Sequence, residues 1–121
     1  MLTRDYVSFE LAPLGETLTA RLRGEIDHHT ARIFREEIDR ALLRETPRNL
    51  TLDFSEISFV DSSGIGLIVG RLEQARAIGA TLTLSGLSLR LSRLLELSGV
   101  SRLKGIVIAK QSEREAFSDE T

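Results

Sequence analysis

The chain of 121 residues has no cysteine and almost no net charge, and both absences narrow its possible roles. Without cysteine, a disulfide framework and a thiolate metal site are excluded. The formal net charge is −2 and the arginines are spread along the chain, so no basic face for a nucleic-acid backbone stands out. We therefore expect no direct binding to nucleic acid.

Long apolar runs and a basic, apolar leader segment are also missing from the chain. Its longest apolar runs, such as 65–69, are far too short to cross a bilayer, and the missing leader argues against secretion. Apolar residues make up 41% and charged residues 28%, as in an ordinary globular protein. We expect a single cytoplasmic domain over residues 1–121, with no membrane partner.

Strand-like segments alternate with helical ones along the chain. Partial alternation predicts an N-terminal hairpin from 6–12 and 17–23, joined by a turn at Pro13-Leu14-Gly15-Glu16. Further strands are predicted at 50–54, 81–84 and 106–108, and the stretch 57–60 runs from the first of these toward the serine pair.

Helical periodicity predicts about four helices. The first should end before Pro47, the second should span 63–78 with Gly79 as its C-terminal cap, and the third should end at Ser98-Gly99. A fourth is predicted from Ser112, because Ser112 and Glu115 have capping-box spacing. The predicted core positions are Phe34, Ile38, Ala41 and Leu42 in the first helix, Ile65, Ile68, Leu72 and Ala75 in the second, and Leu87, Leu91, Leu94 and Leu95 in the third.

This alternation predicts an α/β domain with a mixed, mostly parallel sheet and right-handed helical crossovers. In such sheets the segments that leave the C-terminal ends of the strands gather at one edge, where ligands and partners bind. Segments 25–29 and 61–64 each leave a predicted strand in this way. We expect them to be spatial neighbours.

The segment Asp61-Ser62-Ser63-Gly64 opens the second helix, where unpaired backbone N–H groups favour an oxygen side chain or a phosphate. One reading is plain helix capping. The other is modification of Ser63, because phosphorylation would add about 1.5 to 2 negative charges that a helix start tolerates. The fold should then survive, and the effect should fall on whatever docks there.

The glycines that follow, in 64–70 (GIGLIVG), favour the second reading. Each interior glycine weakens a helix by about 1 kcal/mol relative to alanine, so another interaction must offset the loss. Gly66, Leu67, Val69 or Gly70 could stay outside the core as a partner-binding surface. The alternative is a helix that is buried on both faces.

His28 and His29 precede the first long helix, but adjacent residues rarely point to the same place and no ligand cluster accompanies them. We predict no metal site, and Asp27 is more simply the cap of that helix. A serine hydrolase would need Ser63 as nucleophile and His28 or His29 as base. The motif is wrong for it, since a nucleophile elbow reads Gly-x-Ser-x-Gly, and we predict no catalytic residues.

Three segments together resemble the STAS domain of anti-sigma factor antagonists: 24–31 (GEIDHHTA), 58–66 (SFVDSSGIG) and 97–100 (LSGV). The resemblance covers nearly the whole chain in order and spacing. Asp-His-His-Thr combined with Asp-Ser-Ser-Gly is most similar to the sporulation branch, the anti-sigma F factor antagonists. The general-stress-response antagonists are the second choice.

The resemblance implies a cycle of partner exchange. The unphosphorylated protein would bind its anti-sigma factor, an ATP-bound dimeric serine kinase, and release the sigma factor. The kinase would then phosphorylate Ser63, and a serine phosphatase would restore the active form. The resemblance implies partner-binding roles for Asp27, His28, Asp61, Ser62, Gly64, Ile65 and Gly66.

Two further expectations follow. No phosphate-cradling glycine-rich loop that ends in lysine and serine or threonine is present, so we expect no cofactor here and place ATP on the partner. A STAS domain that acts as a passive scaffold or ligand sensor is a third possibility, and it predicts no phosphorylation.

Overall fold

The computed structural model describes residues 6–109, and its elements alternate in the predicted order. They are β1 (Tyr6–Leu11), β2 (Thr17–Ile26), α1 (His28–Glu45), β3 (Asn49–Val60), α2 (Ser63–Ala77), β4 (Thr81–Ser85), α3 (Leu89–Ser98), a 3-10 turn (Val100–Arg102) and β5 (Ile106–Ile108). The fourth helix, predicted from Ser112, lies outside the described residues.

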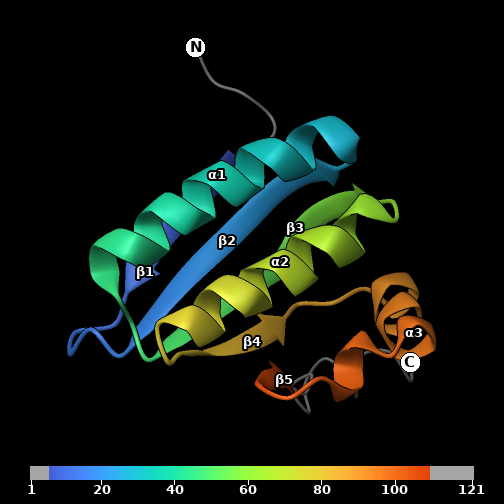
Figure 1. The fold of residues 1–121 in the computed structure, drawn as a ribbon. Coiled ribbons are helices and arrows are strands. Elements are labelled where there is room, and N and C mark those ends of the chain that lie inside the picture. Colours follow the sequence, from blue (N-terminus) through green and yellow to red (C-terminus); the bar gives the residue numbers. More distant parts are fainter. Residues whose placement is uncertain (1–5, 110–121) are drawn as a thin grey trace, which may run out of the picture.

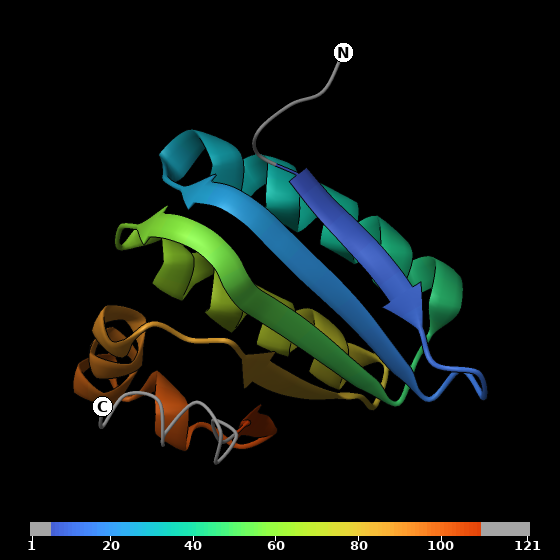
Figure 2. The same cartoon turned by 180° about the vertical axis from the view of Figure 1, so that it is seen from behind.

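The five strands form one mixed sheet in the order β1-β2-β3-β4-β5. β1 and β2 are the predicted antiparallel hairpin, and the other neighbouring pairs are parallel. Helices α1 and α2 lie side by side over one face of the sheet (Figure 1), and the view from behind shows the strands of the other face in front of them (Figure 2). The α/β fold with a mostly parallel sheet is thus confirmed.

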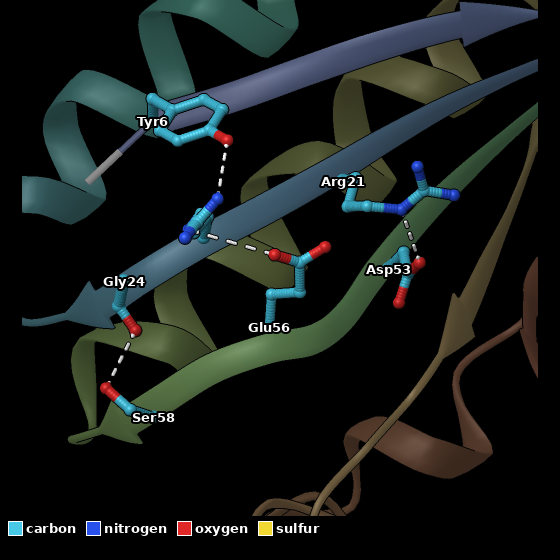
Figure 3. Close-up of polar contacts among 7 residues, drawn as sticks. Tyr6, Arg21, Gly24, Asp53, Glu56 and Ser58 are labelled. Carbon is cyan, nitrogen blue, oxygen red and sulfur yellow. Dashed lines mark hydrogen bonds and ion pairs between the residues drawn. The ribbon is translucent and has the colours of Figure 1, made fainter. Parts of the chain in front are cut away.

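The two faces of the sheet differ in polarity because side chains alternate along each strand. In β2, Leu18, Ala20 and Leu22 are fully buried under the helices, whereas Thr19 and Arg21 between them are only half-buried. The polar face carries contacts between strands: Arg21 Nε lies 3.0 Å from Asp53 Oδ2, and Arg23 donates a hydrogen bond of 3.0 Å to the hydroxyl of Tyr6 (Figure 3). This alternation fixes which side of the sheet the helices cover.

The strand predicted at 50–54 is longer than expected and continues through 57–60 as far as Val60, and β2 continues past the predicted end at Arg23 as far as Ile26. The strand β3 bulges twice against β2. Arg21 pairs with Asp53 but Arg23 with Glu56, and Gly24 pairs with Ile57 but Glu25 with Phe59. The bulges let a longer strand end level with a shorter one, which sequence periodicity alone could not indicate.

Helices α1 and α3 largely confirm the predicted core. Phe34, Ile38, Ala41 and Leu42 are all buried, and α1 ends at Glu45 before Pro47 as expected. In α3, Leu91 and Leu95 are buried and Leu87 packs against the core, while Leu94 is only half-buried. The side chain of Ser88 caps α3, and Gly99 ends it with a φ of 84°.

Helix α2 turns a slightly different face to the sheet than predicted. Its buried residues are Gly64, Leu67, Ile68, Arg71, Leu72 and Ala75, a stripe of three- and four-residue steps. Ile65 is half-buried rather than central, and Leu67, predicted as a possible outside residue, is buried. The stripe is shifted because Gly64, not Ile65, packs against β3, and the shift brings the charged Arg71 into a buried position.

Candidate functional site

The C-terminal ends of β2 and β3 bring the two predicted segments together. Ile26 and Val60, the last residues of these strands, pair in the sheet, and the backbone N–H of Asp61 donates to the carbonyl of Ile26 at 3.0 Å. Nearby, Ser58 Oγ donates to the carbonyl of Gly24 at 3.2 Å (Figure 3). The prediction that 25–29 and 61–64 are neighbours is therefore confirmed.

Asp27 is the N-cap of α1, as predicted. Its Oδ1 accepts the backbone N–H groups of His29 and Thr30, both at 2.9 Å, while Thr30 Oγ1 accepts the N–H of Asp27 at 2.9 Å and donates to the carbonyl of Glu25 at 2.7 Å. The N–H of Thr30 is the main cause that holds the pKa of Asp27 below its ordinary value. The cap fixes the point at which the chain passes from the sheet into α1, and with it the position of the exposed His28 and His29.

Asp61 plays a similar part at the start of α2. Its Oδ1 accepts the backbone N–H of Ser63 at 2.7 Å. The exposed Ser62 takes the N-cap position, but its side chain makes no capping hydrogen bond. Ser63 is half-buried, and its hydroxyl has no hydrogen bond to any of the described residues. Capping therefore falls to Asp61, and neither serine hydroxyl is used for it.

The three glycines of α2 differ in how much space surrounds them. A Cβ built on Gly64 would lie 2.5 Å from Cγ2 of Val60, so this position needs glycine for close packing. Gly66 and Gly70 have no neighbour within 4 Å of such a Cβ, and Gly66 is exposed. The alternative of a helix buried on both faces is therefore wrong. Gly66 and Gly70 open the outer surface of α2.

The open surface continues into a groove of about 490 Å³ between α1 and α2. From α1 it is lined by His28, Arg32 and Arg35, and from α2 by Ser63 and Arg71 together with the two outward glycines. Ser63 and His28 are thus brought to one surface, as predicted. The three arginines were not among the predicted site residues. The spacing of 28, 32 and 35 places Arg32 and Arg35 on the same side of α1 as His28 and could have indicated these two, whereas Arg71 lies on α2.

The hydrolase and metal alternatives gain nothing from this geometry. His28 and Ser63 line the same groove, but no hydrogen bond joins them in the part of the chain that the structure describes. Over residues 6–109, no group of three or more metal-ligating side chains gathers. No helix within these residues is long and apolar enough to cross a membrane.

Comparison with known families decides the assignment. Residues 9–116 match the STAS domain family. The chain belongs to the STAS family. The Asp-Ser-Ser-Gly segment at the start of α2 belongs to one of the three segments on which the resemblance to STAS domains was based.

Curated STAS relatives carry two related names. An anti-sigma F factor antagonist of Paenibacillus polymyxa is 34% identical over 89 residues, which cover 74% of this chain and 76% of that protein. An anti-sigma-B factor antagonist of Bacillus subtilis is 34% identical over 97 residues, which cover 79% of this chain and 84% of that protein.

Among solved STAS structures, the anti-sigma factor antagonist SpoIIAA matches in two forms. The unphosphorylated form aligns with a TM-score of 0.67 and 27% identity, covering 95% of this chain and 97% of SpoIIAA. The phosphorylated form of SpoIIAA from Bacillus aligns with a TM-score of 0.66 and 28% identity, covering 96% of this chain and 100% of SpoIIAA.

Proposed function

We propose that this STAS protein is an anti-sigma factor antagonist, a cytoplasmic switch that binds an anti-sigma factor while unphosphorylated and so releases a sigma factor. Two curated relatives that are each 34% identical, one an anti-sigma F and one an anti-sigma-B factor antagonist, support the proposal. The proposed binding surface is the sheet edge formed by Asp27 and His28 with Asp61, Ser62, Gly64, Ile65 and Gly66. The chain has no role as an enzyme in this scheme.

Phosphorylation of Ser63 is the proposed off-signal. The observation that carries this is the position of its hydroxyl, in the first turn of α2, on the groove and without a hydrogen bond to the described residues. A phosphate there meets the favourable end of the helix dipole, so the fold should tolerate it. Asp61 already accepts the N–H of Ser63 and would add repulsion toward the phosphate and toward an acidic partner surface.

The proposed partners are a serine kinase that is itself the ATP-bound anti-sigma factor, and a serine phosphatase that reverses the modification. Between the two branches we favour sigma F and sporulation, because the segment Asp27-His28-His29-Thr30 next to Asp61-Ser62-Ser63 resembles that branch. The identity to the anti-sigma-B factor antagonist keeps the general stress response as the second candidate.

The test is incubation with the cognate anti-sigma factor and magnesium ATP, followed by peptide mass spectrometry. We expect one phosphate on Ser63 and none in the Ser63→Ala variant. The Ser62→Ala variant is the matched control, because its neighbouring exposed hydroxyl is removed and phosphate transfer should persist. Phosphate on Ser62 instead would correct the site. No transfer at all would favour a passive STAS scaffold or sensor.

Binding measurements test the direction of the switch. By calorimetry, Ser63→Ala should bind the anti-sigma factor as tightly as the unmodified wild type, whereas Ser63→Asp should fold and bind at least tenfold more weakly. Tight binding by Ser63→Asp would contradict control by charge at this position.

A further inference from the structure

Arg71 is unusual among the charged residues because it is only 4% exposed and yet lines the groove between α1 and α2. Its Nε lies 2.8 Å from Oδ1 of Asp39 on α1, within ion-pair distance. The N–H does not point at that oxygen, so the contact lacks a hydrogen bond. The Nη1 atom of Arg71 is also buried and has no hydrogen-bond partner among the described residues. Two nitrogens of the guanidinium therefore lack a hydrogen-bond acceptor among the described residues.

An unsatisfied, buried guanidinium is unfavourable, and the charges around it add to the imbalance. Burial lowers the pKa of Arg71 and raises that of Asp39, while the charge of Arg35 lowers both. The negative charges of Asp39 and Glu73 raise the pKa of Arg71. None of the residues that line the groove is acidic, and Arg32 and Arg35 stand exposed on its α1 side. The groove has positive charge in excess.

The shape of the groove gives access to this charge. Gly66 and Gly70 precede Arg71 on α2 and present no side chain, and a Cβ at either position would meet open space. A side chain from a docked protein can therefore lie against the helix backbone in the groove that Arg71 lines. A larger residue at either position would fill that space.

We propose that the groove between α1 and α2 is an anion subsite, in which Arg71, with Arg35 beside it, receives the carboxylate of an aspartate or glutamate of the anti-sigma factor. The identity of this occupant rests on the proposed function, whereas the anion subsite itself does not. An incoming carboxylate offsets the excess positive charge of the groove. It gives the complex a charged anchor about two helical turns from Ser63 along α2.

The isolated protein tests the subsite without any partner. Sodium acetate is titrated against sodium chloride at constant ionic strength while the arginine Nε–Hε signals are followed by NMR. We expect a saturable shift of the Arg71 signal and no comparable shift of Arg40, which is exposed and paired with Glu37. Equal, linear shifts of both signals would overturn the subsite. A response to inorganic phosphate but none to acetate would overturn the carboxylate assignment.

Charge reversal tests the occupant in the complex. Arg35→Glu should weaken binding to the anti-sigma factor at least tenfold and reduce its salt dependence. Arg40→Glu, on the same helix and outside the groove, is the matched control and should change binding less than twofold. Both positions are exposed, so thermal unfolding should show both variants folded.

The two proposals fail in different ways. Equal binding by Arg35→Glu and Arg40→Glu would overturn the occupant and leave the antagonist function intact. If the wild type does not bind the anti-sigma factor at all, the proposed function fails, and the acetate titration still decides the subsite.

Discussion

The contact between Gly64 and Val60 sets the position of the Ser63 helix, and a double-mutant cycle can measure it. A Cβ on residue 64 would lie 2.5 Å from Cγ2 of Val60, and Val60 is itself only 6% exposed. The neighbouring atom belongs to a short, β-branched side chain that cannot swing away. Gly64→Ala must therefore displace either the strand end or the start of α2.

The expected magnitude combines two opposing effects. Overpacking of this kind costs about 1 to 3 kcal/mol. Alanine returns up to about 1 kcal/mol through its higher helix propensity. Gly64→Ala should then lower the free energy of unfolding by about 1 to 2 kcal/mol. Val60→Ala alone should lower it by about 2 kcal/mol through lost burial. The double variant removes the clash, so its loss should be about 1 to 3 kcal/mol smaller than the sum of the two single losses.

Urea unfolding followed by circular dichroism gives the four free energies that the cycle needs. Gly66→Ala is the matched control, because a Cβ there meets no neighbour within 4 Å and should not couple to Val60→Ala. Strict additivity of Gly64→Ala and Val60→Ala would refute the packing argument, and so would equal coupling by the control.

Three further outcomes follow from other positions. Gly70→Ala should raise the free energy of unfolding by up to about 1 kcal/mol, because its Cβ meets open space. The same variant should bind the anti-sigma factor more weakly, because the new side chain enters the groove. A variant that is more stable but binds as tightly as the wild type would contradict this. Because the folded state lowers the pKa of Asp27, wild-type stability should fall as pH drops through the ordinary value of 3.8 and below. Any stability advantage of the wild type over Asp27→Asn should therefore shrink between pH 5 and pH 2 in urea titrations, and a pH-independent difference would exclude the carboxylate as its source. Gly86→Ala should lower the urea midpoint of unfolding, because residue 86 has a φ of +66° and a Cβ there would lie 2.6 Å from the backbone N of Ser55. An unchanged midpoint would contradict strain at this position.

The fold was predictable to the extent that local patterns decide it. The amphipathic period of α1, its cap Asp27 and its stop before Pro47 are all local signals, and each is confirmed. The meeting of segments 25–29 and 61–64 followed from the general rule for parallel strands. Neither required knowledge of particular side-chain contacts.

What escaped prediction depends on neighbours distant in sequence. The continuity of β3 through its bulges is decided by pairing with β2. The phase of α2 is decided by the close approach of Gly64 to Val60. Arg71 was missed because a charged residue is expected on the surface, and here Asp39 of another helix accompanies it into the interior. Arg35 is an exposed residue of α1, and only the position of α2 makes it a wall of a groove.

The two bulges of β3 determine how the two loops of the proposed interface are aligned. They lengthen one strand by two residues relative to its neighbour, so that Val60 ends opposite Ile26. If one bulge were replaced by a regular ladder while β3 kept its length, one loop would move past the other by about 3.3 Å and the side chains of the shifted stretch would turn to the opposite face of the sheet. Asp27 and Ser63 would then be misaligned although every residue of both motifs was intact. The binding surface is therefore encoded partly in strand length, a property that no motif of this chain records.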